Sequence, residues 1–365
     1  MPNDNVIKME HGAGGEPMQA LIRDLILNNI TGRSAGLVGL DDLDDGATIN
    51  ISSIIENNNN NGNSNDNSNC NNPGEIVVTT DSHVIKPAFF PDSNIGRLAV
   101  SGTVNDLAVM GAEPLALTCA MIVPEGFELS SFEKIVRSMS EAAEEVDVPI
   151  ITGDTKTVER NGLDSIIINT TGIGIANEVI RDCGLCTGDK IILTGTIGDH
   201  GISLLAHREG FELTTDLVSD VAPLWNMLKD VVQIRTIEGK PAISAMKDPT
   251  RGGLAGTLNE MAQKSGTGIL IEQNDLPIKK SVASACEMLG IDPLEVANEG
   301  KAVICVKAEH AEEVLAILRE HEYGKDAAII GEATEENLGK VLMRTPIGSM
   351  RYVDPPTGDL IPRIC

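Results

Sequence analysis

Short apolar segments alternate with helical segments in the first half of the chain, and this order restricts the fold more than any other feature of the sequence. Helix-like stretches at 93–111 and 130–146 separate strand-like stretches at 76–80, 115–123, 148–152 and 165–175. Such an alternation is typical of α/β domains. The second half repeats the pattern, with strands at 190–195, 268–272, 302–306, 327–332 and 340–344 and helices up to 208, at 218–233, after 253 and at 309–320. We predict an α/β (α+β) fold.

The chain has 365 residues, enough for two domains with separate cores. We predict an N-terminal arm and helix at 1–35, an N-terminal domain at 36–180, a C-terminal α/β domain at 181–350 and a mobile tail at 351–365. Residues 56–74 are mostly Asn, Ser and Gly, which predicts a disordered insertion. Aromatic residues make up 2% of the chain, so aliphatic side chains must build the cores.

Charge and cysteine content exclude several classes of protein. The formal net charge of −26 disfavours nucleic-acid binding, which requires clustered Lys and Arg. The seven cysteines are odd in number and widely spread, so a disulfide framework is not expected. Because no apolar stretch approaches the length of a membrane span or leader, we predict a cytoplasmic protein.

Acidic residues that lie far apart in the sequence occupy similar local positions. Each sits at a strand exit, at a helix start or within an apolar helix: Asp44 or Asp45, Asp81, Asp106, Asp154 and Asp248. Carboxylate oxygens at such places suit Mg²⁺, which usually bridges nucleotide phosphates. The chain lacks the glycine-rich patterns of P-loop and dinucleotide-binding proteins. We therefore predict a nucleotide site built from acids and glycines.

Two further motifs leave alternatives open. Cys183 and Cys186 form a C-x-x-C pair that could be half of a zinc site, a redox pair or two incidental thiols. Gly198–Gly201 opens a helix with glycines and His200, which suits an anion, but helix capping explains the motif equally well.

The C-terminus carries a thiol on an extended segment. Residues 354–359 contain two prolines and a glycine, so they are poor helix or strand formers and predict a tether that ends at Cys365. On residue type alone, this is either a reactive sulfur on a movable arm or a frayed terminus with an incidental cysteine.

Six sequence blocks, taken together, resemble a known family. They are Thr80–His83, Gly102–Ala108, Gly153–Lys156, Lys247–Gly253, Ala297–Gly300 and the terminal Pro362–Cys365. The whole set is similar to the HypE family of hydrogenase maturation factors. The Asn-Asp and Asp-Pro-Thr-Arg-Gly-Gly blocks are shared in outline with aminoimidazole ribonucleotide synthetase and selenophosphate synthetase. The terminal Pro-Arg-Ile-Cys is far more specific.

This resemblance implies an architecture and an activity. The N-terminal domain would pair with its twin into a barrel across a homodimer, next to a layered C-terminal α/β domain. The terminal cysteine would accept a carbamoyl group from the carbamoyltransferase HypF. The protein would then dehydrate that group to a thiocyanate with ATP and Mg²⁺. The cyanide would pass to iron on the HypC–HypD complex, for the [NiFe] hydrogenase centre.

The resemblance also implies roles for individual residues. Cys365 would carry the group, Glu299 would act as the base, Lys156 would neutralise developing charge, and His83 would orient the substrate. A structural role for Glu299 or His83 remains an alternative. The nucleotide would contact Asp81, Asn105, Asp154, Arg251 and Gly252. The metal ligands would come from Asp44, Asp45, Asp106 and Asp248.

Two other functions compete with this interpretation. The first is another ATP-dependent phosphotransferase of the same superfamily, similar to selenophosphate synthetase. That enzyme has a reactive cysteine or selenocysteine followed by Gly and Lys near its N-terminus, whereas this chain has His11–Ala13 there and no cysteine before Cys70. The second is a carrier without catalytic activity, in which the terminal cysteine only docks to a scaffold or binds metal.

Overall fold

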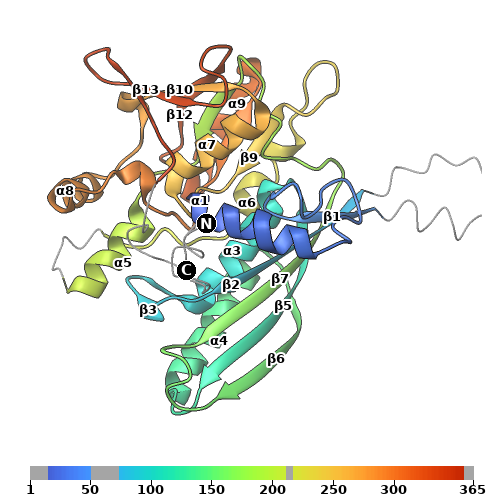
Figure 1. Ribbon diagram of the computed structural model, residues 1–365, viewed down its shortest axis with the longest axis vertical. Helices are drawn as coiled ribbons and strands as arrows, with labels where there is room; N and C mark the ends of the chain where they lie inside the picture. The colour runs from blue at the N-terminus through green and yellow to red at the C-terminus, as the bar shows by residue number, and fades with distance from the viewer. Residues whose placement is uncertain (1–14, 51–73, 211–216, 357–365) are drawn as a thin grey trace, which may run out of the picture.

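A computed structural model describes residues 15–50, 74–210 and 217–356 of the chain. The expectations for the 56–73 part of the insertion, for His11–Ala13 and for Cys365 lie outside these residues. The described residues form two α/β domains, each built on one large sheet (Figure 1). The predicted two-domain α/β fold is therefore confirmed.

The N-terminal domain contains a five-stranded sheet, coloured mostly cyan and green in Figure 1. Only β5 and β6 are parallel neighbours among its paired strands. The strand order is β1 (Ala47–Asn50), β2 (Glu75–His83), β7 (Ile167–Ala176), β5 (Glu113–Pro124) and β6 (Ile150–Val158). Strand β7 therefore lies at the centre, and β6 forms an edge.

Two helices, α3 (Ile95–Val109) and α4 (Leu129–Glu145), pack against each other, and α3 contacts strands β2 and β7 of this sheet. In α3 every residue except Arg97 and Asp106 is buried. Small residues permit this burial: a Cβ added to Gly96 would lie 2.3 Å from the carbonyl oxygen of Ile135 in α4. The Asn94 side chain caps the start of α3 by accepting a hydrogen bond from Gly96 N at 2.8 Å.

The C-terminal domain contains a seven-stranded sheet in which only the β10–β13 pair is parallel. Its order is β14 (Met350–Tyr352), β13 (Val341–Arg344), β10 (Gly268–Glu272), β12 (Ala328–Thr334), β8 (Lys190–Leu193), β11 (Val303–Val306) and β9 (Ile243–Lys247). The longer helices of this half are α5 (Asp199–Glu209), α7 (Gly253–Ser265), α8 (Lys280–Leu289) and α9 (Ala311–Glu320).

Short elements connect these layers. They are α1 (Gly15–Leu21), the π-helical η2 (Ile22–Leu27), β3 (Phe89–Phe90), β4 (Ser93–Asn94), α6 (Trp225–Leu228) and the 3₁₀ turns η3 (Val231–Gln233), η4 (Gln273–Asp275), η5 (Pro293–Glu295), η6 (Ala308–His310) and η7 (Glu322–Gly324). Among the described residues, no helix is both long and apolar enough to span a membrane.

The main hydrophobic core is continuous across both domains. Leu98 and Ile135 of the N-terminal helices belong to the same buried cluster as Leu224, Trp225 and Ile304 of the C-terminal half. A second cluster, with Leu254, Leu258 and Ile271 among its members, lies within the C-terminal domain alone. The two sheets are thus joined by a shared apolar layer.

Three local predictions were wrong. The expected buried strand at 148–152 is the longer β6, which is exposed along almost its whole length because it is an edge strand. Asp154 lies within β6, and Asp81 lies within β2, so neither acid follows the end of its strand as expected. The helix expected at 218–233 contracts to α6 and η3, because Pro223 cannot take an interior helical position.

Candidate active site

A cavity of about 190 Å³ lies where the two domains meet. The N-terminal domain contributes residues from the loop before β1, from β2 and from α3, and the C-terminal domain contributes residues after β9 and before β11. Its lining residues are Asp45, Thr79, Thr80, Asp81, His83, Gly102, Asp106, Asp248, Thr250, Arg251 and Glu299. The structure therefore brings together seven of the predicted site residues: Asp45, Asp81, His83, Asp106, Asp248, Arg251 and Glu299.

Strand periodicity and a small helix residue shape the N-terminal wall of the cavity. Thr79, Asp81 and His83 alternate along β2, so their side chains share one face of the sheet. Helix α3 passes this face at Gly102, where an added Cβ would lie 3.0 Å from His83 Cε1. One turn further along, Asp106 Oδ2 accepts a hydrogen bond from Thr79 Oγ1 at 2.7 Å.

Three acids of the cavity hold protons more tightly than ordinary carboxyl groups. Burial, followed by repulsion from Asp248, raises the pKa of Asp106 well above its usual value. Burial, with repulsion from Asp45, raises the pKa of Asp248 to about 7. Burial and the charge of Asp248 likewise raise the pKa of Glu299 well above normal. The cavity thus gathers more negative charge than its own cations balance.

Two groups in the cavity can carry positive charge, and neither neutralises the acids. Arg251 Nη2 lies 3.8 Å from Asp81 Oδ1, and the Arg251 side chain is 43% exposed. His83 Nε2 lies 3.4 Å from Asp81 Oδ2, but burial lowers the pKa of His83, so the imidazole is neutral. Both ring nitrogens of His83 are buried without a hydrogen-bond partner in the described part of the chain.

The two candidate acids of the 41–46 loop have different surroundings. Asp45 lines the cavity; its Oδ1 pairs with Lys247 Nζ, and its Oδ2 is buried without a partner in the described structure. Asp44 does not line the cavity and lies 3.4 Å from Arg181 Nε. Burial and the charge of Asp182 raise the pKa of Asp44 to about 6. Of the two, Asp45 is the one placed to bind a ligand.

Glu299 stands on a turn that is held by buried polar contacts. Its backbone N–H donates to Asp220 Oδ1 at 3.0 Å, and Asp220 Oδ2 lies 3.2 Å from Lys301 Nζ. Asn105 donates to the carbonyl oxygens of Glu299, at 3.4 Å, and Ala222, at 3.0 Å. These contacts fix the backbone that carries the Glu299 carboxyl group.

Asn105, Gly252, Asp154 and Lys156 do not line the cavity. The amide of Asn105 is occupied by main-chain groups, because its Oδ1 also accepts from Leu224 N at 2.8 Å. Gly252 has φ +79° and packs against Pro356, where an added Cβ would lie 3.1 Å from Pro356 Cγ. Asp154 and Lys156 are exposed on β6 and lie 3.2 Å apart. The nucleotide and catalytic roles expected of these residues stay predictions.

Sequence reasoning missed Thr79, Asp220, Lys247 and Lys301. Thr79 could have been found, because it lies two residues before Asp81 and shares its face of a strand. Asp220 and Lys301 act on the backbone around Glu299 through contacts between distant segments. No local pattern marks them.

The donor set of the cavity fits a magnesium ion. Asp45 Oδ2 is a buried, unpaired oxygen, and burial together with repulsion between neighbouring acids raises the pKa values of Asp106 and Asp248, so a cation placed among them would be favoured. Within the described ranges no three His, Cys, Asp or Glu side chains are arranged to hold an ion by themselves. Mg²⁺ commonly takes one or two carboxylates and completes its shell with phosphate and water. Such a shared shell suits this cavity.

Comparison with known proteins gives the same organisation. Residues 65–176 match the family model described as AIR synthase related protein, N-terminal domain, and residues 187–344 match its C-terminal domain. A putative hydrogenase expression/formation protein of Methanocaldococcus jannaschii is 52% identical over 97% of this chain and 98% of its own length. The carbamoyl dehydratase HypE of Azotobacter vinelandii is 40% identical over 98% and 97%. The chain belongs to the HypE family.

Solved HypE structures share the complete fold. One is a HypE–HypF complex, which matches with a TM-score of 0.79 at 40% identity over 92% of this chain and 100% of the other. Another is HypE in complex with ATP, with a TM-score of 0.76 at 36% identity over 99% and 100%. The match to solved HypE structures therefore includes both of the domains that line the acidic cavity.

Proposed function

We propose that this protein is an ATP-dependent carbamoyl dehydratase, which converts an S-carbamoyl group on Cys365 into a thiocyanate for the iron of [NiFe] hydrogenase. Membership of the HypE family, with relatives named carbamoyl dehydratase, carries this proposal. The acidic cavity supports it, since phosphoryl transfer needs charged groups arranged around ATP and a cation.

In this proposal ATP binds with its phosphates towards the cavity. Asp45, Asp106 and Asp248 would hold Mg²⁺, which neutralises charge on the transferring phosphoryl group. Arg251, partly exposed at the rim, would contact a phosphate, and Asp81 holds it there through their ion pair. The N-terminus of α7, immediately after Gly252, directs backbone N–H groups that favour an anion.

The chemistry then proceeds in two stages. The carbamoyl oxygen attacks the γ-phosphorus of ATP and ADP leaves, which turns a poor leaving group into phosphate. The nitrogen loses both of its protons: one passes to solvent as the O-phosphorylated intermediate forms, and Glu299 accepts the other as the C–O bond breaks and the C≡N bond forms, which releases inorganic phosphate. The sum is S-carbamoyl plus ATP giving thiocyanate, ADP and phosphate. The raised pKa of Glu299 makes its carboxylate a stronger base than an exposed one.

The root of the tail lies beside this cavity. Val353 is held by a hydrogen bond from Asn259 Nδ2 to its carbonyl oxygen at 2.8 Å, and Pro356 is buried against Gly252. Gly252 follows Arg251, which lines the cavity. Eight residues then separate Pro356 from Cys365, and an extended chain covers about 3.3 Å per residue. A tail of this length would allow the thiol to visit the cavity and a partner in turn.

We further propose a homodimer formed through the β6 edge. Ile150 and Ile151 are 37% and 60% exposed on this strand, and the N–H and C=O groups on the side of β6 opposite β5 have no neighbouring strand among the described residues. A second copy would cover this edge and would bring Asp154 and Lys156 towards the partner's nucleotide. This arrangement accounts for the distance of these two residues from their own cavity.

The expected partners follow from the same activity. HypF would supply the carbamoyl group, as the complex of a similar HypE with HypF suggests. The HypC–HypD complex would receive the cyanide. The five cysteines among the described residues are all free thiols, which suits a cytoplasmic, reducing location.

Mass spectrometry of the C-terminal peptide tests this function. Incubation with HypF, its carbamoyl donor and ATP should add one carbamoyl group to Cys365, and further turnover should remove the mass of one water. Glu299→Gln should accumulate the carbamoyl adduct, with conversion slowed by ~10²–10⁴. Cys186→Ala, which removes an exposed thiol elsewhere, should behave as wild type. Conversion at the normal rate in Glu299→Gln would refute its role as base.

A further inference from the structure

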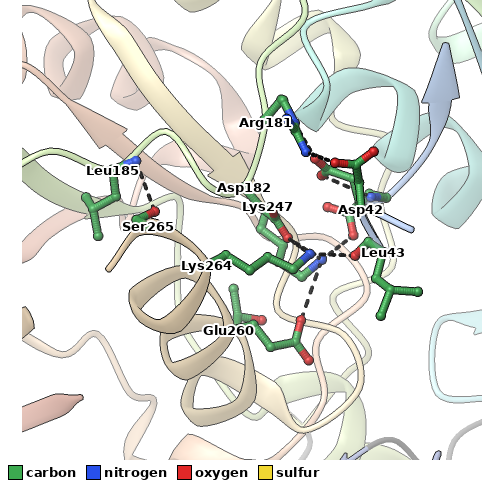
Figure 2. Close-up of polar contacts among 12 residues, drawn as sticks. Asp42, Leu43, Arg181, Asp182, Leu185, Lys247, Glu260, Lys264 and Ser265 are labelled. Carbon is green, nitrogen blue, oxygen red and sulfur yellow. Dashed lines mark hydrogen bonds and ion pairs between the residues drawn. The ribbon is translucent and has the colours of Figure 1, made fainter. Parts of the chain in front are cut away.

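One lysine lies directly behind the acidic cavity. Lys247 ends strand β9, and the next residue, Asp248, lines the cavity. The Lys247 ammonium is surrounded by carboxylates: it pairs with Asp45 and lies 3.6 Å from Asp182 Oδ2 and 3.8 Å from Glu260 Oε2. Figure 2 shows Lys247 and Lys264 side by side between Asp182 and Glu260. The proposed chemistry assigns Lys247 no role.

The contact with Asp45 is asymmetric. Lys247 Nζ donates to Oδ1, while Oδ2 of the same carboxylate is buried and has no partner among the described residues. Asp45 belongs to the cavity lining. A carboxylate held on one side by an ammonium ion keeps its second oxygen available as a metal ligand.

We propose that Lys247 is the positioning residue of the metal site. Its ammonium group fixes one oxygen of Asp45 and presents the other to the divalent cation that accompanies ATP. This inference rests on the proposed function only for the presence of that cation. It concerns binding of the metal and needs no assumption about dehydration.

A neighbouring lysine provides the matched control. Lys264 Nζ donates to Leu43 O and to Asp182 Oδ2, both at 2.6 Å, so it also ties the 41–46 loop to the C-terminal domain (Figure 2). It makes no contact with Asp45 in the described structure. Loss of Lys264 would therefore weaken the attachment of the 41–46 loop, while Lys247 would still orient Asp45.

Binding of Mn²⁺ tests the proposal without any turnover. Free and bound Mn²⁺ would be measured by electron paramagnetic resonance on the full chain with a non-hydrolysable ATP analogue. Lys247→Met should weaken Mn²⁺ binding by about 10-fold or more. Lys264→Met should change it by less than about twofold, even though its melting temperature falls. Lys247→Gln, a milder change, replaces Lys247→Met if the latter fails to fold and should weaken binding at least about threefold.

A double mutant separates positioning from general loss of structure. In an Asp45→Ala background, Lys247→Met should cause no further loss of Mn²⁺ affinity, because the oxygen that it orients is gone. An equal loss in that background would overturn the proposal. So would unchanged or tighter binding in Lys247→Met, the latter showing that the ammonium competes with the metal.

The wild-type measurement separates failure of the Lys247 role from failure of the metal site itself. If wild type binds Mn²⁺ with the nucleotide and Lys247→Met binds it equally, only the role of Lys247 is refuted. If wild type binds no Mn²⁺ in the presence of the nucleotide, the metal site of the proposed function is refuted, and the role of Lys247 with it.

Discussion

Two acidic clusters lie side by side between the domains, and they differ in how their charge is balanced. In the first, which we term the paired cluster, Asp42, Asp44, Asp182 and Glu260 lie among Arg181, Lys247 and Lys264. In the second, the acidic cavity, Asp106, Asp248 and Glu299 face one another with little positive charge. The two clusters contain the same residue types, so acid content alone does not mark a functional site.

Asp45 connects the two clusters. One of its oxygens is satisfied by Lys247 of the paired cluster, and the other is buried and unpaired at the cavity. The ion pairs of the paired cluster hold the 41–46 loop to the C-terminal domain. The carboxylates of the acidic cavity have no comparable partners, so a cation from solution can bind among them. The absence of a counter-charge, and not the presence of acids, therefore distinguishes a candidate binding site.

Removing an acid from the cavity should have the largest effect. We expect Asp106→Asn and Asp248→Asn to lower kcat/KM for ATP by at least ~10³, because each removes a charged group that acts on the transferring phosphoryl group. Their melting temperatures without metal should not fall, since each substitution relieves repulsion. Steady-state kinetics and thermal melts check both parts, and normal turnover in both variants would contradict the assignment.

Removing an acid from the paired cluster should do the opposite. Asp182 is 1% exposed and contacts Lys264 Nζ at 2.6 Å. Asp182→Asn removes the buried carboxylate between the Lys247 and Lys264 ammonium groups and leaves their charge less balanced, so we expect a loss of about 3–5 kcal/mol in the free energy of unfolding. Urea denaturation measures it. A loss below about 1 kcal/mol would show that the paired cluster contributes little to stability.

The two clusters should also differ in their dependence on pH. In the absence of a bound cation the folded pKa of Asp248 is about 7, against 3.8 for the ordinary group. Its protonated form therefore stabilises the fold fully below about pH 4, and this contribution is lost as the pH rises through 7. We expect stability to fall by up to about 2 kcal/mol between pH 5 and 7.

Thermal melts at several pH values, with and without Mg²⁺ and ATP, check this slope. Asp248→Asn should flatten it, and the bound ligand should reduce it in wild type by supplying positive charge. A slope unchanged in Asp248→Asn would mean that other groups cause it, with Asp44 the first to examine because its pKa is about 6.

The smallest effect should come from an ion pair on the surface. Lys86 Nζ lies 3.1 Å from Asp164 Oδ2, but the two side chains are 71% and 85% exposed. Asp164→Ala should change the free energy of unfolding by no more than about 0.5 kcal/mol, because solvent screens the pair. A loss comparable to that of Asp182→Asn would show that burial does not explain the contribution of the paired cluster.

Local patterns were sufficient to predict much of the fold. Apolar periodicity located β2, β5, β7, α3 and α4 to within a few residues. Helix α8 and strand β9 were missed: the buried residues of α8, Val282, Ala285 and Cys286, have helical spacing but two of them are small, and Ile243–Lys247 is only five residues long. The exposure of β6 could not be predicted, since it depends on the strand's place at the edge of the sheet.

The candidate site was predictable only in part. Seven residues singled out from the sequence do line one cavity, because they lie at strand and helix positions that the fold brings to the domain boundary. Which of Asp44 and Asp45 faces that cavity was not predictable, because the answer depends on Arg181 and Lys247. Lys247 is 202 positions away from Asp45 in the sequence, so no local pattern indicates their contact.

The shared core has a consequence for how the chain can be divided. Leu98 and Ile135 pack in one apolar cluster with Leu224, Trp225 and Ile304. Either half expressed alone would expose its share of this surface to water and would be prone to aggregate. The two domains should consequently unfold as a single cooperative unit, and a break of the chain in the 177–189 connection should leave two fragments that are soluble only when they reassociate.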